Sequence, residues 1–258
     1  MKIASHNLDF ERATELRNKL TSLNELRRQI IFGRDEFMDI SKDKALFGAQ
    51  QLFSLDNPPR RIEGYDISHQ GGQDVVGSMV VFTNGVADKR EYRKFKISHN
   101  KNDDFAAMAE VMTRRFSPRH ISWGMPDLIV VDGGAPQINA VCDKVLDLPI
   151  IGMAKDNDEI IVSKTNSHVS LNKIEKLATD KSHNIAIDDC GGFYSINLHV
   201  GARHSAGHSF AFLGNAEINP YTDLLKLLQR LRDESHRFAI TYHQSLKRKR
   251  QTSGELDN

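Results

Sequence analysis

The sequence predicts an α/β protein built around one mixed β-sheet, and three observations support this prediction. Residues 128–131, LIVV, form an unbroken apolar run, which is typical of a parallel strand buried on both faces. Residues 61–97 contain three β-type segments, two of them joined by an Asn-Gly turn signal. The segments after them alternate between helical and strand patterns, which indicates helices packed on a sheet.

The composition is typical of a globular protein with one full core and an appendage. The chain has 258 residues, of which 39% are hydrophobic and 27% are charged, and the formal net charge is +1. No apolar stretch approaches the roughly 18 residues that span a bilayer, and the N-terminus turns polar before a signal peptide can develop. Two cysteines suit a reducing compartment. We therefore expect a cytoplasmic protein without a membrane segment.

The first 57 residues are expected to be helical. In residues 8–31 apolar side chains recur at helical spacing, so we expect one amphipathic helix that buries its stripe in its own domain or against a partner. Residues 33–57 form a looser helical connector, which two prolines end. The sequence thus predicts a segment 1–57 followed by a domain 58–258.

The domain is expected to begin with three antiparallel strands and to continue with alternating helices and strands. The strands are expected at residues 61–68, 75–83, 90–97, 126–134 and 150–154, with helices at 103–116 and around 138–148. This βββαβαβ order is that of the RNase H-like fold, in which the first and fourth strands lie side by side and parallel. A final helix is expected from about residue 221 to residue 249.

Residues 156–219 have weak periodicity and are rich in Gly, Ser, Asn and His. We expect a short helix at 170–178 and a hairpin around 193–200. The histidines match no standard zinc spacing, so we expect no metal site among them.

Three residues point to a catalytic site. Asp132 follows the apolar run directly and precedes two glycines, at the carboxyl end of a strand where ligands bind in open α/β sheets. Asp66 lies in the first strand and would meet Asp132 across adjacent strands. Carboxylate pairs hold Mg²⁺ or Mn²⁺ ions that activate water, and His236 in the final helix could supply a third ligand. A solvated turn acid and a structural helix histidine remain the alternatives.

Five ordered motifs resemble the C-terminal nuclease domain of the UvrC family of bacterial nucleotide excision repair. They are RIEGYDISH (61–69), DDFAAM with TRRF (103–116), PDLIVVDGGAPQ (126–137), IIGMAK (150–155) and RDESHRFAITYH (232–243). The resemblance implies an RNase H-like endonuclease that cuts the damaged strand on its 5′ side, with Asp66, Asp132 and His236 as its catalytic and metal-binding triad. Damaged double-stranded DNA would be its substrate.

The resemblance extends to partners and to DNA contacts. LDFERATELRNKL (8–20) resembles the second half of the UVR motif, the helical hairpin that holds UvrC to UvrB. Lys155 and Arg237 match motif positions near the site and are candidate phosphate contacts, with ordinary surface cations as the alternative. Two further arginines, at 114 and 115, belong to a basic cluster that could follow phosphates. His69 is a weaker candidate that would support Asp66, whereas Glu110 is better explained as an exposed helix glutamate.

Three departures from the family pattern leave alternatives open. The family's GIY-YIG nuclease and helix-hairpin-helix repeats have no counterpart in this sequence, and the first helix of the UVR hairpin is absent, so we expect a fragment or a reduced homologue. Residues 156–219 are expected to form an insertion longer than the family usually carries. The alternatives in function are another RNase H-like nuclease, such as a resolvase, and a non-catalytic remnant that binds DNA or UvrB.

Overall fold

The computed structural model describes residues 40–70, 74–97, 103–154, 158–180, 185–198 and 219–254. Those from Lys44 onward belong to one compact unit. The helix expected at 8–31 lies outside the described residues.

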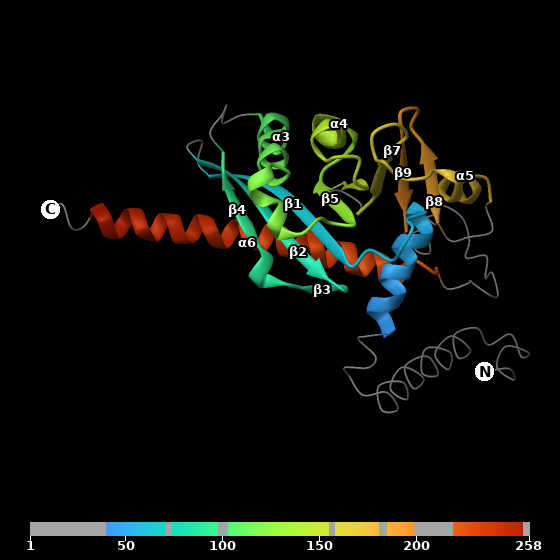
Figure 1. Cartoon of the computed structure of the whole chain (residues 1–258), viewed down its shortest axis with the longest axis horizontal. Helices are drawn as coiled ribbons and strands as arrows, with labels where there is room; N and C mark the ends of the chain where they lie inside the picture. The colour runs from blue at the N-terminus through green and yellow to red at the C-terminus, as the bar shows by residue number, and fades with distance from the viewer. Residues whose placement is uncertain are drawn as a thin grey trace, which may run out of the picture. The chain divides into compact units, whose positions relative to one another are not determined.

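The centre of the structure is a mixed sheet in which the first and fourth predicted strands are neighbours (Figure 1). The strands at its centre are β1 (Arg61–Gln70), β2 (Asp74–Thr83), β5 (Leu128–Asp132) and β6 (Ile150–Met153). β1 pairs antiparallel with β2 and parallel with β5, and β5 pairs parallel with β6. These pairings confirm the predicted strand order. The continuous apolar run of β5 is buried between two strands and two layers of helices, as expected for a central parallel strand.

Further strands extend the sheet at both edges. Beyond β2 lie β3 (Val86–Ala87) and β4 (Arg93–Lys96), and beyond β6 lie β7 (Ile160–Ser163), β9 (Phe193–Asn197) and β8 (Ala186–Asp189), in that order. The hairpin expected around 193–200 instead joins β8 to β9 through a turn at Gly191, whose φ is +82°. The strands β7, β8 and β9 thus continue the central sheet in a region for which only a helix and a hairpin were expected.

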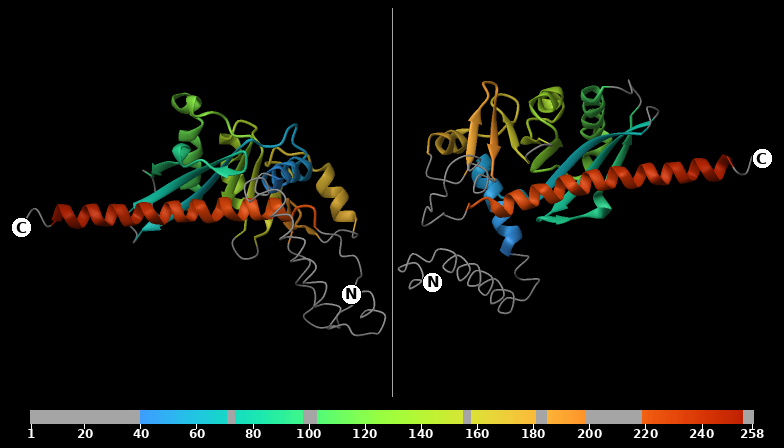
Figure 2. Two further views of the ribbon diagram at one scale, coloured as in Figure 1. Left: turned by 90° about the horizontal axis from the view of Figure 1, so that it is seen from below. Right: turned by 180° about the vertical axis from the view of Figure 1, so that it is seen from behind.

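Helices cover both faces of the sheet. Figure 2 shows the long helix α6 (Thr222–Gly254) crossing the face opposite α3 (Asp104–Arg115) and α4 (Ala135–Val141). A helix at residues 40–53 packs on the first turns of α6, and α5 (Asn172–Thr179) lies beside β8, close to the expected 170–178. Short 3₁₀ turns complete the fold: η1 (Lys89–Glu91), η2 (Pro118–Trp123) and η3 (Cys142–Lys144).

The sequence explains why these helices begin and dock where they do. Asp103 caps α3, because its side chain accepts hydrogen bonds of 3.0 Å from the backbone N–H groups of Phe105 and Ala106. Gly64 on β1 lets α6 approach closely, since a Cβ at Gly64 would lie 2.8 Å from Cγ of Leu231. The helix that carries His236 is therefore held directly against the strand that carries Asp66. No helix in the described part of the chain is both long enough and apolar enough to cross a membrane.

Candidate active site

Two acidic residues lie side by side where β1 and β5 stop pairing. The last paired residues are Tyr65 and Val131, and Asp66 and Asp132 follow them directly. Side chains alternate between the faces of a sheet, so both acids share the face of Gly64, which is the face that α6 covers. Asp66 is buried, with 3% exposure, and Asp132 is half-buried. Asp66 and Asp132 thus lie on neighbouring strands, as the sequence predicts, with Asp132 at the end of β5 and Asp66 within β1.

His236 reaches Asp66 from the helix above. The neighbouring Ser235 faces the sheet, and its carbonyl accepts a hydrogen bond of 3.3 Å from the hydroxyl of Ser78, the residue paired with Asp66 on β2. This contact fixes the rotation of α6 about its axis. Nδ1 of His236 lies 3.6 Å from Oδ2 of Asp66, and the side chain of His236 is 66% exposed. The ring thus joins a buried carboxylate to the solvent.

Asp132 and His236 line one open cavity of about 490 Å³. Its other lining residues are Arg232, Asp233, Arg237 and Ile240, all on α6. Positions 232, 236 and 240 are one helical turn apart and therefore form one wall, opposite the tip of β5. The cavity combines carboxylate, imidazole and guanidinium groups, which suits a phosphate ester and a cation.

The donor chemistry of this site fits a divalent metal ion. Hard cations such as Mg²⁺ and Mn²⁺ prefer carboxylate oxygens, and one oxygen of each acid, Oδ2 of Asp66 and Oδ1 of Asp132, is buried. Within the described ranges no three His, Cys, Asp or Glu side chains stand close enough together to form a ready-made metal site. Asp66 thus lies close to His236, and Asp132 lines the same cavity as His236. The three side chains do not form one compact cluster.

Arg232 is fixed at the edge of this cavity. It forms an ion pair with Asp158, which lies two residues before β7. Oδ2 of Asp158 also accepts a hydrogen bond of 2.7 Å from Nε2 of Gln229. Partial burial opposes the charge of Arg232, but the contacts with Asp158 outweigh it and raise its pKa. The loop end before β7 is thereby tied to α6.

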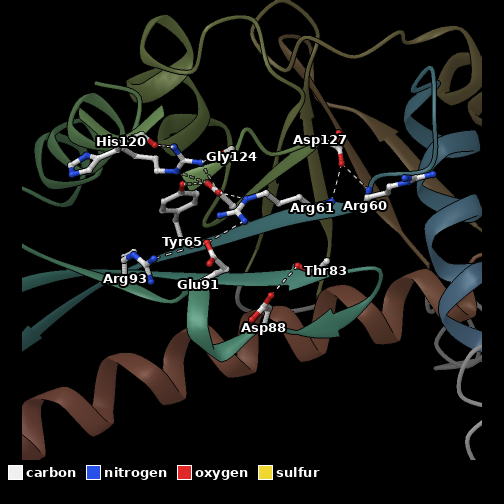
Figure 3. A network of polar contacts seen from close by, with 12 residues as sticks. Arg60, Arg61, Tyr65, Thr83, Asp88, Glu91, Arg93, His120, Gly124 and Asp127 are labelled. Atoms are coloured by element: carbon white, nitrogen blue, oxygen red, sulfur yellow. Dashed lines mark hydrogen bonds and ion pairs between the residues drawn. The ribbon is translucent and has the colours of Figure 1, made fainter. Parts of the chain in front are cut away.

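The prediction that Arg115 contacts DNA is wrong. Its side chain is fully buried and forms two hydrogen bonds with Glu63, one of 2.8 Å and one of 3.0 Å. Arg61 and Tyr65 bind the same carboxylate at 2.8 Å and 2.5 Å. Figure 3 shows both of these residues together with Gly124. A buried charge needs such partners, so Arg115 holds α3 to β1 and cannot reach a ligand.

The other candidates lie in different places. Arg237 lines the cavity, whereas Arg114 is on α3, across the sheet from it, and donates to the carbonyl of Lys96 at 2.6 Å. His69 faces α3 and pairs with Asp104, so it does not support Asp66. Glu110 also lies on α3 and is 3.3 Å from Arg114. Lys155 lies outside the described residues.

Sequence reasoning missed two residues of the cavity wall, Arg232 and Asp233. The signal that could have found Arg232 is its spacing, four residues before His236 on a helix, which places both side chains on one face. Its motif also begins with this residue. Asp158 gave no signal, because it stands in a polar stretch without periodicity.

Comparison with protein-family models identifies two regions. Residues 50–189 match the UvrC RNase H endonuclease domain, and residues 1–26 match the UvrB/UvrC motif. The first match contains Asp66 and Asp132 and runs through β7 into β8, and it agrees with the RNase H-like strand order. The family model therefore includes more than half of the segment expected to be an insertion.

Curated relatives share this similarity over most of the chain. The UvrABC system protein C of Chlorobium phaeobacteroides is 34% identical over 223 residues, which are 84% of this chain and 28% of that protein. The protein of the same name from Methanococcoides burtonii is 33% identical over 251 residues, which are 93% of this chain and 34% of that protein. The chain thus spans about a third of the length of these relatives.

Solved structures resemble it only weakly. Human endonuclease V has a TM-score of 0.36 and 13% identity, with 79% of this chain and 98% of that chain covered. Endonuclease V of Ciona intestinalis, solved with an inosine-containing DNA, has a TM-score of 0.33 and 11% identity, with 63% and 80% covered. Similarity at this level says nothing about substrate or mechanism.

Proposed function

Because the chain belongs to the UvrC family, we propose that it is a metal-dependent DNA endonuclease that makes the 5′ incision in the damaged strand within a UvrABC-type system. The observation that carries this proposal is the cavity beside His236. Asp132 lines it together with His236, Asp66 lies 3.6 Å from the histidine, and two arginines stand on the same wall. A phosphodiesterase needs oxygen ligands for a cation and cationic donors for phosphate in one place.

The residues would divide the chemistry between them. Asp66 and Asp132 would hold Mg²⁺ or Mn²⁺ through their carboxylates, and the sheet fixes both backbones so that these oxygens need little reorganisation. Such an ion, when bound, lowers the pKa of water and stabilises negative charge on the phosphate. His236 would complete the ligand set or move a proton, which its exposed ring can exchange with solvent.

The reaction is hydrolysis of one phosphodiester bond. Water attacks phosphorus in line with the leaving 3′-oxygen, the new P–O bond forms as the old one breaks, and a proton from the water ends on the leaving oxygen. The products are a 5′-phosphate and a 3′-hydroxyl. Damaged double-stranded DNA is the proposed substrate, and the match of residues 1–26 to the UvrB/UvrC motif supports UvrB as the partner that presents it.

Substitution of Asp132 by Asn tests the assignment. We expect Asp132→Asn to lower metal-dependent nicking of a lesion-bearing duplex by at least about a hundredfold, because the amide keeps the shape but loses the anionic ligand. Nicking is measured with UvrB and Mg²⁺ or Mn²⁺, and thermal unfolding shows that the variant folds. Asp188→Asn, on the exposed surface of the edge strand β8, is the matched control and should nick like the wild type.

The same assay separates the alternatives. Full activity of Asp132→Asn would overturn the site. Cleavage of branched DNA without UvrB would favour a resolvase-like nuclease, and DNA or UvrB binding without cleavage under any condition would favour a non-catalytic remnant.

A further inference from the structure

Arg237, which lines the cavity, is held in place by Glu234, an acid that does not line it. Nε of Arg237 donates to Oε2 of Glu234 at 2.8 Å, and Nη2 donates to Oε1 at 2.5 Å. Two parallel hydrogen bonds of this kind fix the plane of the guanidinium as well as its position. The arginine side chain is 55% exposed, whereas that of Glu234 is only 16% exposed. The acid is therefore the fixed member of the pair.

Glu234 is in turn held by Tyr92, the residue just before the edge strand β4. The hydroxyl of Tyr92 donates to Oε1 of Glu234 at 3.1 Å, and Tyr92 is 8% exposed. Its ring packs edge-to-face on Phe238, with ring centroids 5.1 Å apart. The hydrogen bonds from Arg237 and Tyr92 to Glu234 thus link the three residues.

This linkage leaves donors of Arg237 available at the cavity. Arginine has five N–H donors, and Glu234 engages only Nε and one Nη2 hydrogen. Among the residues that the structure describes, Nη1 of Arg237 donates no hydrogen bond. Because Arg237 lines the cavity with Asp132 and His236, its remaining donors can meet a phosphate there.

We propose that Glu234 and Tyr92 are positioning residues that present the guanidinium of Arg237 to a phosphate of the substrate strand beside the catalytic cavity. The inference rests on the proposed function. A free arginine loses much side-chain entropy when it binds, whereas one already held in its bound orientation loses less. Accurate placement of a phosphate matters for rate, because small displacements of a reacting group slow the chemistry strongly.

A Glu234→Gln variant distinguishes positioning from simple electrostatics. Removal of a negative charge near DNA weakens repulsion, so electrostatics alone predicts DNA binding and nicking that are equal or stronger. Positioning predicts that metal-free DNA affinity does not fall while the nicking rate at saturating DNA falls roughly ten- to a hundredfold. Tyr92→Phe should lower the nicking rate in the same direction by a smaller factor.

The effect must also depend on Arg237. Arg237→Ala should lower the slope of log K against log salt by about one, as expected for one lost phosphate contact. In the Arg237→Ala background, Glu234→Gln should cause no further loss of nicking, because nothing is left to position. Glu175→Gln, an exposed acid on α5, is the control for loss of one negative charge and should change neither rate nor slope.

The outcomes separate this inference from the proposed function. Wild-type nicking rates in Glu234→Gln, or losses that simply add in the double variant, would overturn positioning while leaving the nuclease assignment intact. Absence of nicking by the wild type would overturn the nuclease assignment. The phosphate contact is then judged from binding alone: an unchanged salt slope in Arg237→Ala overturns it, and a slope lower by about one supports it.

Discussion

The buried carboxylate of Glu63 is the polar centre of the face opposite the cavity. It accepts hydrogen bonds from Arg61, Tyr65 and Arg115. The side chains of Arg115 and Glu63 are both fully buried. An ion pair of this kind adds little net stability over an apolar pair, but loss of one partner leaves a buried charge and is costly. Its role is to fix α3 on β1, so that β1 holds Asp66 in one position for α6.

Tyr65 makes this network sensitive to alkaline pH. Burial, followed by the charge of Glu63, raises the pKa of Tyr65 well above its ordinary value of 10.0. The unfolded chain therefore loses this proton at a lower pH than the folded chain, and the contribution of Tyr65 to stability is full below about pH 10 and declines above it. The free energy of unfolding should fall there by up to about 1.4 kcal/mol per pH unit from this residue.

A Tyr65→Phe variant checks that prediction. At neutral pH it should be less stable by about 1–3 kcal/mol, because Glu63 loses a buried donor. Above pH 10 the difference from the wild type should narrow, since phenylalanine does not titrate. Urea unfolding at pH 7 to 12 measures both values, and a difference that stays constant across this range would contradict the raised pKa.

At the scale of elements, the position of α6 decides whether the site exists. Asp66 belongs to β1 and His236 to α6, and their contact depends on how closely helix and strand approach at Gly64. A Cβ at Gly64 would lie 2.8 Å from Leu231 and 3.1 Å from Val80, closer than ordinary van der Waals contact. The glycine is thus part of the site although it bears no functional group.

Gly64→Ala should consequently lower the nicking activity even at temperatures where the variant remains folded. Overpacking at this contact costs about 1–3 kcal/mol and moves α6 away from β1, which separates His236 from Asp66. We expect nicking to fall at least about tenfold at temperatures where the variant is still folded. Leu231→Ala in the same chain makes room and should restore part of the activity, whereas Gly192→Ala, with no atom within 4 Å of its new Cβ, should act like the wild type. Wild-type activity in Gly64→Ala would show that the close approach of α6 to β1 is not needed for nicking.

Across the whole molecule, the sequence was informative where structure depends on local pattern. The apolar run before Asp132, the alternation around Asp66 and the helical spacing around His236 each predicted their elements, and the strand order followed from them. Arg115 was misassigned because its partner Glu63 is 52 residues away, and an exposed arginine looks the same in sequence as a buried one. The sheet extension at β7 was missed because three consecutive apolar residues, at 160–162, are too short a pattern to predict a strand.

The N-terminal segment and the nuclease domain should act independently, the first in binding UvrB and the second in binding DNA. Leu16 belongs to the apolar stripe of residues 8–31, inside the match to the UvrB/UvrC motif, so an acid there should weaken UvrB binding at least about tenfold by placing a charge in an apolar contact. Asn18→Asp, on the polar side of the same helical pattern, adds the same charge and should bind UvrB normally. Binding is measured with the full chain by titration with UvrB, and UvrB-dependent nicking should fall in parallel. Metal-free DNA affinity of Leu16→Asp should stay at the wild-type level, because the cavity and its arginines are unchanged. A loss of DNA affinity equal to the loss of UvrB binding would contradict this separation of functions.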